Sequence, residues 1–333
     1  MGERVVAVTG ATGFVGRHMV RALLERGHRV RGMVRDAEKA SGVLPPHERL
    51  EWVQEPGGIS EDSAERLVEG CDTAVHTIGI IREASGGQTF KRMHTEATRW
   101  MVRACEHAGT QRYLHMSALG VRDHGISQYQ KTKFEAEQIV RFSDLDWTIF
   151  RPGLIHGSDS AVFEMMKKWC EGRDAPWLFL PYFLRTEVVV PGVTNDRESA
   201  LPLTVEAPKV APVHIDDVCE AFCLAMEHRE SVGEIYALAG PETMTWPEML
   251  RRVRDALPQA KDNLIPIGLP APIAAAKAWA LKQLGMGDLL PFDVGMALMA
   301  AEDSVAPSVK ARAQLGYEPR AFTESMRGYA AGA

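Results

Sequence analysis

The stretch TGATGFVG, residues 9–16, follows the apolar run Val5–Val8 and precedes a segment with helical spacing. Its glycines, Gly10, Gly13 and Gly16, are spaced three apart. A helix N-terminus carries unpaired backbone N–H groups and a partial positive charge, which favour a phosphate that no side chain keeps away. Gly10 permits the tight turn, Gly13 lets the backbone approach a pyrophosphate, and Gly16 lets the helix pack closely on the strand. The stretch therefore predicts a dinucleotide-binding strand–loop–helix unit.

Strand-like and helical segments alternate through the first half of the chain. A helix is expected from Phe14 to about Arg26, ended by Gly27, and strands are expected in residues 4–10, 28–36, 50–54, 73–79, 112–118 and 146–153. This alternation predicts an α/β protein with a Rossmann-type doubly wound parallel sheet. The rhythm changes after Arg151 and returns in residues 209–228. We expect an NAD(P)-binding domain of residues 1–157 plus 209–240 and a smaller substrate-binding lobe of residues 158–208 plus 241–330.

Composition excludes several classes of protein. The 333 residues carry a formal net charge of −6, which gives no electrostatic footprint for nucleic acid. The five cysteines form no CxxC pair, so we expect reduced thiols in a cytoplasmic protein, with Cys219 and Cys223 as core residues and no metal site. We expect no signal peptide, and no apolar run reaches the roughly 18 residues of a spanning helix.

Two stretches are unusually apolar, PWLFLPYFL at residues 176–184 and IPIGLPAPIAAAKAWALKQLG at residues 265–285. They are interpreted first as a buried lobe or the wall of a pocket. The alternative is peripheral docking on a membrane surface.

The end of the second expected strand faces the adenosine ribose of a bound dinucleotide, where an acidic residue suits NAD and an arginine suits the 2′-phosphate of NADP. The sequence there is VRGMVRD, with Arg35 at the expected contact position and Asp36 beside it. Arg35 favours NADP. A register shift of one residue would give the contact to Asp36 and favour NAD.

A second group of residues indicates proton-transfer chemistry. Tyr129 and Lys133 are four residues apart and therefore share one face of a helix. An ammonium near a phenol favours the phenolate, so Lys133 is expected to lower the pKa of Tyr129 toward neutrality. Ser117 ends a strand, at the sheet edge where such folds bind ligands, and could hold a substrate oxygen.

These motifs together resemble a known family. TGATGFVG, the strand-end serine, YQKTK beginning twelve residues after it, RPGLIHG and PVHIDDV are similar to short-chain dehydrogenases/reductases of the extended or atypical branch, which includes NAD-dependent epimerases and dehydratases. Within that branch, HMSALGV and FKRMHTEAT look most like the nucleotide-binding accessory subunit of respiratory complex I and its bacterial relatives.

The resemblance implies roles for individual residues. Ser117 and Tyr129 would bind a substrate oxygen and exchange its proton, and Lys133 would hold the nicotinamide ribose. The residues expected to bind the cofactor are Thr9, Gly10, Thr12, Gly13, Phe14, Val15, Gly16, Arg35, Thr77, Ile78, Gly79, Tyr129, Lys133, Pro152 and Gly153. The family often has an aspartate after the third strand, where this chain has VQEPGGIS, and an asparagine where His94 stands.

Several histidines and acids have two interpretations. His94 either replaces that asparagine or is a hydrogen-bonded core histidine, and we favour the core histidine. His214, Asp216 and Asp217 resemble a metal cluster in composition, but a helix N-cap and a hydrogen bond that ties the lobes together explain them better. His156 could meet substrate or pack in a loop.

The leading hypothesis is an NADP-dependent oxidoreductase that acts on a hydroxyl or ketone of a small, apolar molecule. One alternative is a nucleotide-sugar epimerase or dehydratase with tightly held NAD(P). The other is a non-catalytic NADPH-binding subunit or assembly factor of a respiratory-type complex. A homodimer and membership of a larger complex are both open.

Overall fold

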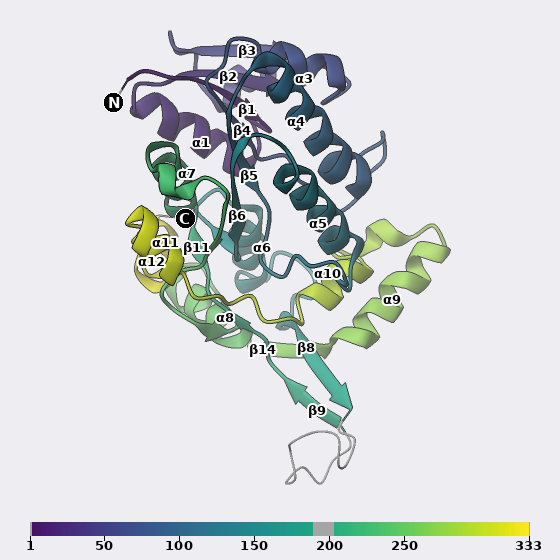
Figure 1. Cartoon of the computed structure of the whole chain (residues 1–333). Coiled ribbons are helices and arrows are strands. Elements are labelled where there is room, and N and C mark those ends of the chain that lie inside the picture. Colours follow the sequence, from purple (N-terminus) through teal and green to yellow (C-terminus); the bar gives the residue numbers. More distant parts are fainter. Residues whose placement is uncertain (1, 189–202, 333) are drawn as a thin grey trace. The chain divides into compact units, whose positions relative to one another are not determined.

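The computed structural model describes residues 2–188 and 203–332, and the chain forms two compact units (Figure 1). The first unit comprises Met1–Ile155, Val213–Gly240 and Ala306–Arg320, and the second comprises His156–Pro212, Pro241–Val305 and Ala321–Ala333.

A parallel sheet forms the centre of the first unit, with strand order β12-β6-β5-β4-β1-β2-β3. Its strands are β1 (Val5–Thr9), β2 (Arg29–Val34), β3 (Leu50–Gln54), β4 (Thr73–His76), β5 (Arg112–Met116), β6 (Asp146–Pro152) and β12 (Glu234–Leu238). The doubly wound parallel sheet expected from the alternating pattern is confirmed, and each of its first six strands lies in a predicted segment.

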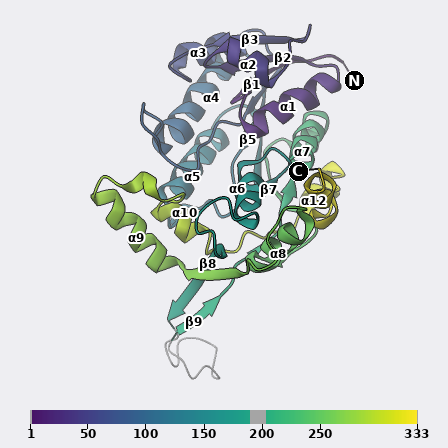
Figure 2. The same ribbon diagram turned by 180° about the vertical axis from the view of Figure 1, so that it is seen from behind.

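Helices cover both faces of this sheet, as Figures 1 and 2 show from opposite sides. One face carries α1 (Phe14–Glu25), α7 (Ile215–Glu227) and α11 (Val309–Leu315), and the other carries α3 (Glu61–Val68), α4 (Ala97–Ala108) and α5 (Gln128–Arg141). Val6 and Val8 of β1 belong to the first core, whereas Ala7 belongs to the second. A strand buried on both faces needs apolar residues at successive positions, which explains the run Val5–Val8.

Three shorter elements complete the first unit. They are α2 (Ala37–Val43), the π-helical segment η1 (Lys91–Glu96) that leads into α4, and the 3₁₀ turn η2 (Arg229–Ser231). From β1 the chain proceeds to β2 and β3 on one side, and then to β4, β5 and β6 on the other. In such sheets, ligands bind outside the carboxyl ends of the strands at this reversal.

The second unit contains a small sheet of order β14-β8-β9. β8 (Leu180–Val188) pairs in parallel with β14 (Pro266–Pro270) and antiparallel with β9 (Leu203–Glu206), and β10 (Lys209–Val210) pairs with β13 (Met244–Thr245). Its helices are α6 (Ala161–Cys170), α8 (Trp246–Ala256), α9 (Ala271–Gln283), the 3₁₀ turn η3 (Gly287–Leu289), α10 (Val294–Met299) and α12 (Phe322–Ala330). The two-residue strands β7 (Ile155–His156) and β11 (Val213–His214) lie at the division of the chain.

The division differs from the predicted one for residues 306–320, which were assigned to the smaller lobe but belong to the first unit. Ala311 and Leu315 of α11 are buried in the core beneath α1 and α7. Ser308 exchanges hydrogen bonds of 3.0 and 3.1 Å with the backbone of Ala239, just after β12. The sequence pattern missed this because a seven-residue helix without a neighbouring strand resembles the irregular elements of the lobe.

Within residues 2–188 and 203–332, none of the helices combines the length and the apolar character needed to cross a bilayer. Part of the predicted lobe, residues 189–202, lies outside the described residues.

Candidate active site

The glycine loop between β1 and α1 is shaped by its missing side chains. Gly10 has a φ of +65°, and the N–H of Gly13 donates a 2.9 Å hydrogen bond to the carbonyl of Gly10. A Cβ on Gly16 would lie 2.0 Å from that same carbonyl oxygen, so only glycine allows α1 to approach β1 this closely. A Cβ on Gly13 would lie 3.2 Å from it, a tight contact.

The N-terminus of α1 has the character of an anion site. Its N-cap residue is Gly13, which supplies no side-chain hydrogen bond, and the first turn holds no acidic residue. The first backbone N–H groups of the helix therefore have no capping oxygen, and the loop before them is bare. The bare loop of Gly10, Gly13 and Gly16 thus fits a pyrophosphate at this helix end, whereas Thr9 is buried and its hydroxyl bonds within the protein.

The two candidate residues at the end of β2 have different surroundings. Asp36 is the N-cap of α2, where its carboxylate accepts a 3.1 Å hydrogen bond from the N–H of Lys39. That hydrogen bond holds the pKa of Asp36 below its usual value. Arg35 is exposed. Asp36 thus has a structural task, and the side chain of Arg35 extends into solvent.

Thr77 and Gly79 follow β4 and have separate functions. The hydroxyl of Thr77 donates a 2.7 Å hydrogen bond to the carbonyl of Thr9, and its N–H donates to the Thr9 hydroxyl at 3.1 Å. Thr77 therefore fixes the start of the glycine loop, with Ile78 next in the chain. A Cβ on Gly79 would lie 3.1 Å from Nζ of Lys133, so glycine leaves room for that ammonium.

Tyr129 and Lys133 lie one turn apart on α5, as predicted. The helix begins after Ser127, which forms a capping box with Gln130 and so fixes the first turn. Lys133 is buried, and its Nζ donates a 2.8 Å hydrogen bond to the carbonyl of Met116. That carbonyl immediately precedes Ser117, so the structure brings Lys133 to the serine at the end of β5.

Ser117 is itself buried, with 3 % of its surface exposed. Its N–H donates a 2.7 Å hydrogen bond to the carbonyl of Phe150 in β6, but its hydroxyl has no hydrogen-bond partner among the described residues. A buried hydroxyl without a partner loses free energy, and a hydrogen bond to a ligand is one way to recover it. Pro152 and Gly153 lie at the end of neighbouring β6, and the N–H of Gly153 donates to the carbonyl of Leu238 at 2.9 Å.

The expectation that Lys133 lowers the pKa of Tyr129 is wrong in this structure. Burial raises the pKa of the Tyr129 phenol to about 12. Burial also lowers the pKa of Lys133 to about 8, against an opposing effect of Glu137. The physical reason is the burial of the phenol, while the Lys133 ammonium directs its hydrogen bond to the carbonyl of Met116.

His94 lies in the π-helical segment and joins α5 to the loop after β4. Its Nδ1 is 2.9 Å from the hydroxyl of Thr132, which donates to the carbonyl of Gln128. Nε2 lies 3.2 Å from the backbone nitrogen of Ile80 and 3.1 Å from its carbonyl oxygen, so both ring nitrogens have polar partners. Burial and the charge of Lys133 lower the pKa of His94 to about 2. A neutral, hydrogen-bonded core histidine accounts for these contacts.

The sequence analysis missed an ion pair behind Lys133. Glu137, one further turn along α5, is fully buried, and its carboxylate accepts a 2.8 Å hydrogen bond from Nε of Arg151 in β6. Glu137 also favours the charged form of Lys133. The spacing of Tyr129, Lys133 and Glu137, each four residues apart, was a signal that all three share one helix face.

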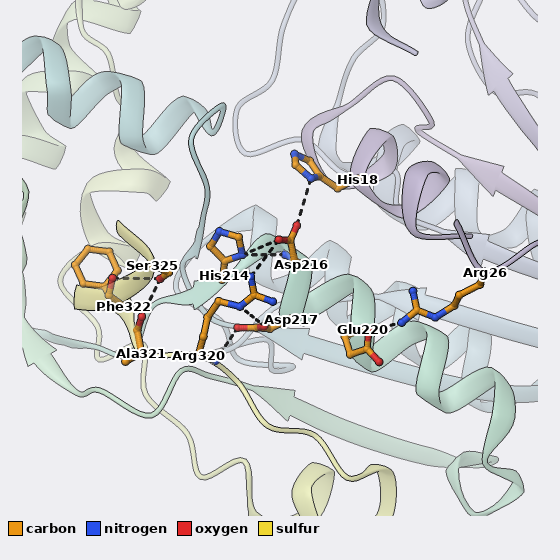
Figure 3. A network of polar contacts seen from close by, with 10 residues as sticks. All are labelled: His18, Arg26, His214, Asp216, Asp217, Glu220, Arg320, Ala321, Phe322 and Ser325. Carbon is orange, nitrogen blue, oxygen red and sulfur yellow. Dashed lines mark hydrogen bonds and ion pairs between the residues drawn. The ribbon is translucent and has the colours of Figure 1, made fainter. Parts of the chain in front are cut away.

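The acids of VHIDDV are structural. Figure 3 shows His214 beside Asp216 and Arg320 beside Asp217. The ring of His214 caps α7 by accepting a 3.2 Å hydrogen bond from the N–H of Asp216, which confirms the predicted N-cap. Asp217 accepts hydrogen bonds from the backbone N–H and Nε of Arg320 at 2.9 and 2.8 Å. This contact lies within the first unit.

The other candidate polar sites are also structural. In the second unit, His156 is buried, with Nδ1 2.9 Å from the hydroxyl of Tyr329, which supports the packing interpretation. All five cysteines are free, as expected, and all five are buried, which includes the predicted core residues Cys219 and Cys223. No group of three potential metal ligands occurs among the residues that the structure describes.

With this geometry established, comparison with known proteins identifies the domain. The family model described as NAD(P)H-binding matches residues 10–169, from the glycine loop to α6. Residues 10–169 are an NAD(P)H-binding domain.

Individual relatives extend this result beyond the NAD(P)H-binding domain. Ceramide reductase of Caulobacter vibrioides is 29% identical over 83% of this chain and 78% of the relative. The mitochondrial NADH dehydrogenase [ubiquinone] 1 alpha subcomplex subunit 9 of Arabidopsis thaliana is 26% identical over 82% of this chain, but the match covers only 62% of that subunit. The resemblance to short-chain dehydrogenases/reductases is thereby confirmed.

The fold agrees with a solved structure of an epimerase. UDP-glucuronic acid 4-epimerase from Bacillus cereus, in complex with UDP-glucuronic acid and NAD, aligns with a TM-score of 0.66 and 18% identity over 98% of each chain. This likeness concerns the fold of the NAD(P)H-binding domain and the unit that follows it.

Proposed function

We propose that the protein is an NADP-dependent reductase that converts a ketone of a small apolar molecule into a hydroxyl. The observation that carries the proposal is the buried, unpartnered hydroxyl of Ser117 beside the Lys133–Met116 hydrogen bond. Together with Tyr129 on α5, these groups match the set that short-chain dehydrogenases/reductases use. The proposal therefore rests on the site as well as on the resemblance.

The cofactor would be held by the backbone of the glycine loop and by Lys133. The bare loop and the uncapped N-terminus of α1 suit its pyrophosphate, and exposed Arg35 suits the 2′-phosphate of NADP. When bound, the nicotinamide supplies the hydride. Pro152 and Gly153 at the end of β6, and Ile78 and Gly79 after β4, would line the ring and ribose.

Three side chains would bind the substrate and the cofactor ribose and supply the proton. The Ser117 hydroxyl would hold the substrate carbonyl oxygen, and Tyr129 would donate a proton to that oxygen. With a pKa of about 12, Tyr129 carries its proton at neutral pH, which suits reduction of a carbonyl. Lys133, with a pKa of about 8, is mostly charged at neutral pH and suits the ribose hydroxyls.

The substrate is proposed to be apolar because the relative from Caulobacter vibrioides is named for ceramide, a lipid. The apolar stretch at residues 176–184 in the second unit supports the same class. The test is consumption of NADPH with a panel of long-chain ketones, with UDP-sugars measured in parallel. Turnover of UDP-sugars alone, without net change in the cofactor, would instead assign the epimerase chemistry.

Tyr129→Phe removes only the proposed proton donor, so kcat should fall by at least about a hundredfold. Tyr317→Phe is the matched control, because it removes the same hydroxyl from a tyrosine of the core beneath α1 and α7, where that hydroxyl has no hydrogen-bond partner among the described residues. Equal activity of the two variants would refute the assignment of Tyr129.

A second candidate is a non-catalytic NADPH-binding subunit, which the likeness to the Arabidopsis thaliana complex I subunit favours. It predicts that the purified protein retains NADPH that no ketone oxidises. It also predicts co-purification with a stable partner from native cells. Turnover of NADPH by the isolated chain would exclude this candidate.

A further inference from the structure

The helix α9 of the second unit buries one face and exposes apolar side chains on the other. Its buried face consists of alanines, Ala271, Ala274, Ala275 and Ala278, each at most 7 % exposed. Ala274 and Ala275 pack with Ala297 of α10 in a small core, and both figures of the whole chain show α9 beside α10. Alanines alone pack α9 against the rest of its unit, so its larger apolar side chains are available for a contact outside that unit.

Those larger residues point outward and gather in one segment. Seven of the sixteen large apolar side chains that are exposed in the described part of the chain fall within residues 265–289. Five of them are on α9 or follow it: Ile273 (68 % exposed), Trp279 (59 %), Leu284 (71 %), Met286 (44 %) and Leu289 (66 %). We call the exposed side of residues 273–289 the α9 face. The exposure of these side chains disagrees with the interpretation of residues 265–285 as a buried lobe.

The α9 face is also positively charged. Asp288 is the one acid of residues 273–289, and residues 263–287 contain none, although the overall composition of 44 acids in 333 residues would place about three there. They contain Lys277 and Lys282, which are exposed and form no ion pair with the described residues. The chain as a whole is acidic, so this segment differs from the rest of the chain in its charge as well as in its exposed apolar surface.

We infer that the α9 face docks on an anionic membrane surface. Apolar side chains, a tryptophan and unpaired lysines on one exposed helix are the combination that inserts among lipid headgroups and is attracted by their charge. A second copy of the chain is a poorer occupant. In a two-fold contact the same face meets itself, so four lysines would approach with only one acid of residues 273–289, Asp288, from each copy to offset them.

The test is sedimentation of the full chain with lipid vesicles, and it does not depend on the proposed reductase activity. Wild type should bind phosphatidylglycerol vesicles and bind phosphatidylcholine vesicles at least about tenfold more weakly. Added salt should weaken the binding because exposed charges are screened. The double variant I273E/L284E and the charge reversal K277E/K282E should each reduce binding about tenfold or more.

Val309→Glu is the matched control, because Val309 is also 68 % exposed but lies on α11 of the first unit. It should bind vesicles like wild type, and circular dichroism should show that all variants are folded. Absence of binding to phosphatidylglycerol, or equal binding by wild type and I273E/L284E, overturns the inference. A dimer in analytical ultracentrifugation that I273E/L284E dissociates also overturns it and assigns the α9 face to a second copy.

Discussion

The Lys133 ammonium donates its hydrogen bond to the carbonyl of Met116, 17 positions earlier in the chain, and this contact joins α5 to the end of β5. It places a buried cation next to the residue that precedes Ser117. Burial raises the pKa of the neighbouring Tyr129 phenol to about 12, so the phenol keeps its proton at neutral pH. Reduction, in which the phenol gives up a proton, follows more directly from this arrangement than oxidation.

The pH dependence of the proposed activity should report Lys133. Its pKa is about 8, so the charged fraction falls as pH rises through that value. We expect kcat/KM for NADPH-dependent reduction to decline above about pH 8. Lys133→Arg keeps the charge and should move this decline to higher pH, whereas Lys131→Arg on the exposed side of α5 should not. An unchanged decline in the Lys133 variant would assign it to another group.

The glycine loop should not tolerate one added carbon. Gly16→Ala places a Cβ 2.0 Å from the carbonyl oxygen of Gly10, so the loop or α1 must move. We expect a loss of stability of about 1 to 3 kcal/mol and an increase in the Kd for NADP of at least about tenfold. Gly42→Ala in α2 meets no atom within 4 Å and should stabilise the chain by about 0.5 to 1 kcal/mol. Calorimetric titration and thermal unfolding measure both effects. Unaltered NADP affinity in Gly16→Ala would remove the loop from the site.

The sequence predicted the parts of the molecule that local pattern controls. The alternation of apolar strands and helices located β1 to β6, and the spacing of Tyr129 and Lys133 placed them on one helix face. Glycine at positions 10, 13 and 16 predicted the loop between β1 and α1, because the sequence shows directly where a side chain is absent.

What the sequence could not give depends on contacts between distant segments. The partner of Lys133 is a backbone carbonyl, and every residue has one, so the sequence does not show which carbonyl is used. The ion pair of Glu137 with Arg151 could not be predicted either, because the chain contains many other residues of opposite charge that could pair with each of them. The raised pKa of Tyr129 comes from burial, which the residues around it determine. α11 was misplaced because its burial against the main core follows from tertiary packing alone.

Cofactor choice should depend on Arg35. Its side chain is exposed at the end of β2, while Asp36 is engaged in capping α2. Arg35→Ala should raise the Kd for NADP about 10- to 100-fold, since hydrogen bonds to a charged phosphate contribute about 1.5 to 3 kcal/mol, and should leave the Kd for NAD within about twofold. Arg29→Ala, at the other end of β2, should change neither constant. Equal losses for both cofactors would show that Arg35 does not contact a 2′-phosphate.

Acid should destabilise the sheet through three buried histidines. Burial lowers the pKa of His76 to about 3 and that of His94 to about 2, and lowers the pKa of His115 well below its usual value. The unfolded chain takes up protons at these rings below about pH 6.5 and the folded chain does not, so stability falls as pH falls. Each ring contributes a slope of about 1.4 kcal/mol per pH unit.

Substitution of His115 tests the contribution of one of these three rings to the dependence of stability on pH. His115 stacks on His76 of the neighbouring strand at 5.5 Å between ring centroids, and neither ring nitrogen has a hydrogen-bond partner among the described residues. His115→Phe should therefore reduce the slope by about 1.4 kcal/mol per pH unit between about pH 4 and 6. His124→Phe is the matched control and should leave the slope unchanged, because the His124 side chain is exposed. Hydrogen exchange of the β4 and β5 amides measures the slope locally. If His115→Phe kept the wild-type slope, His115 would have to be charged or accessible in the folded state, against its burial beside His76 and Tyr113.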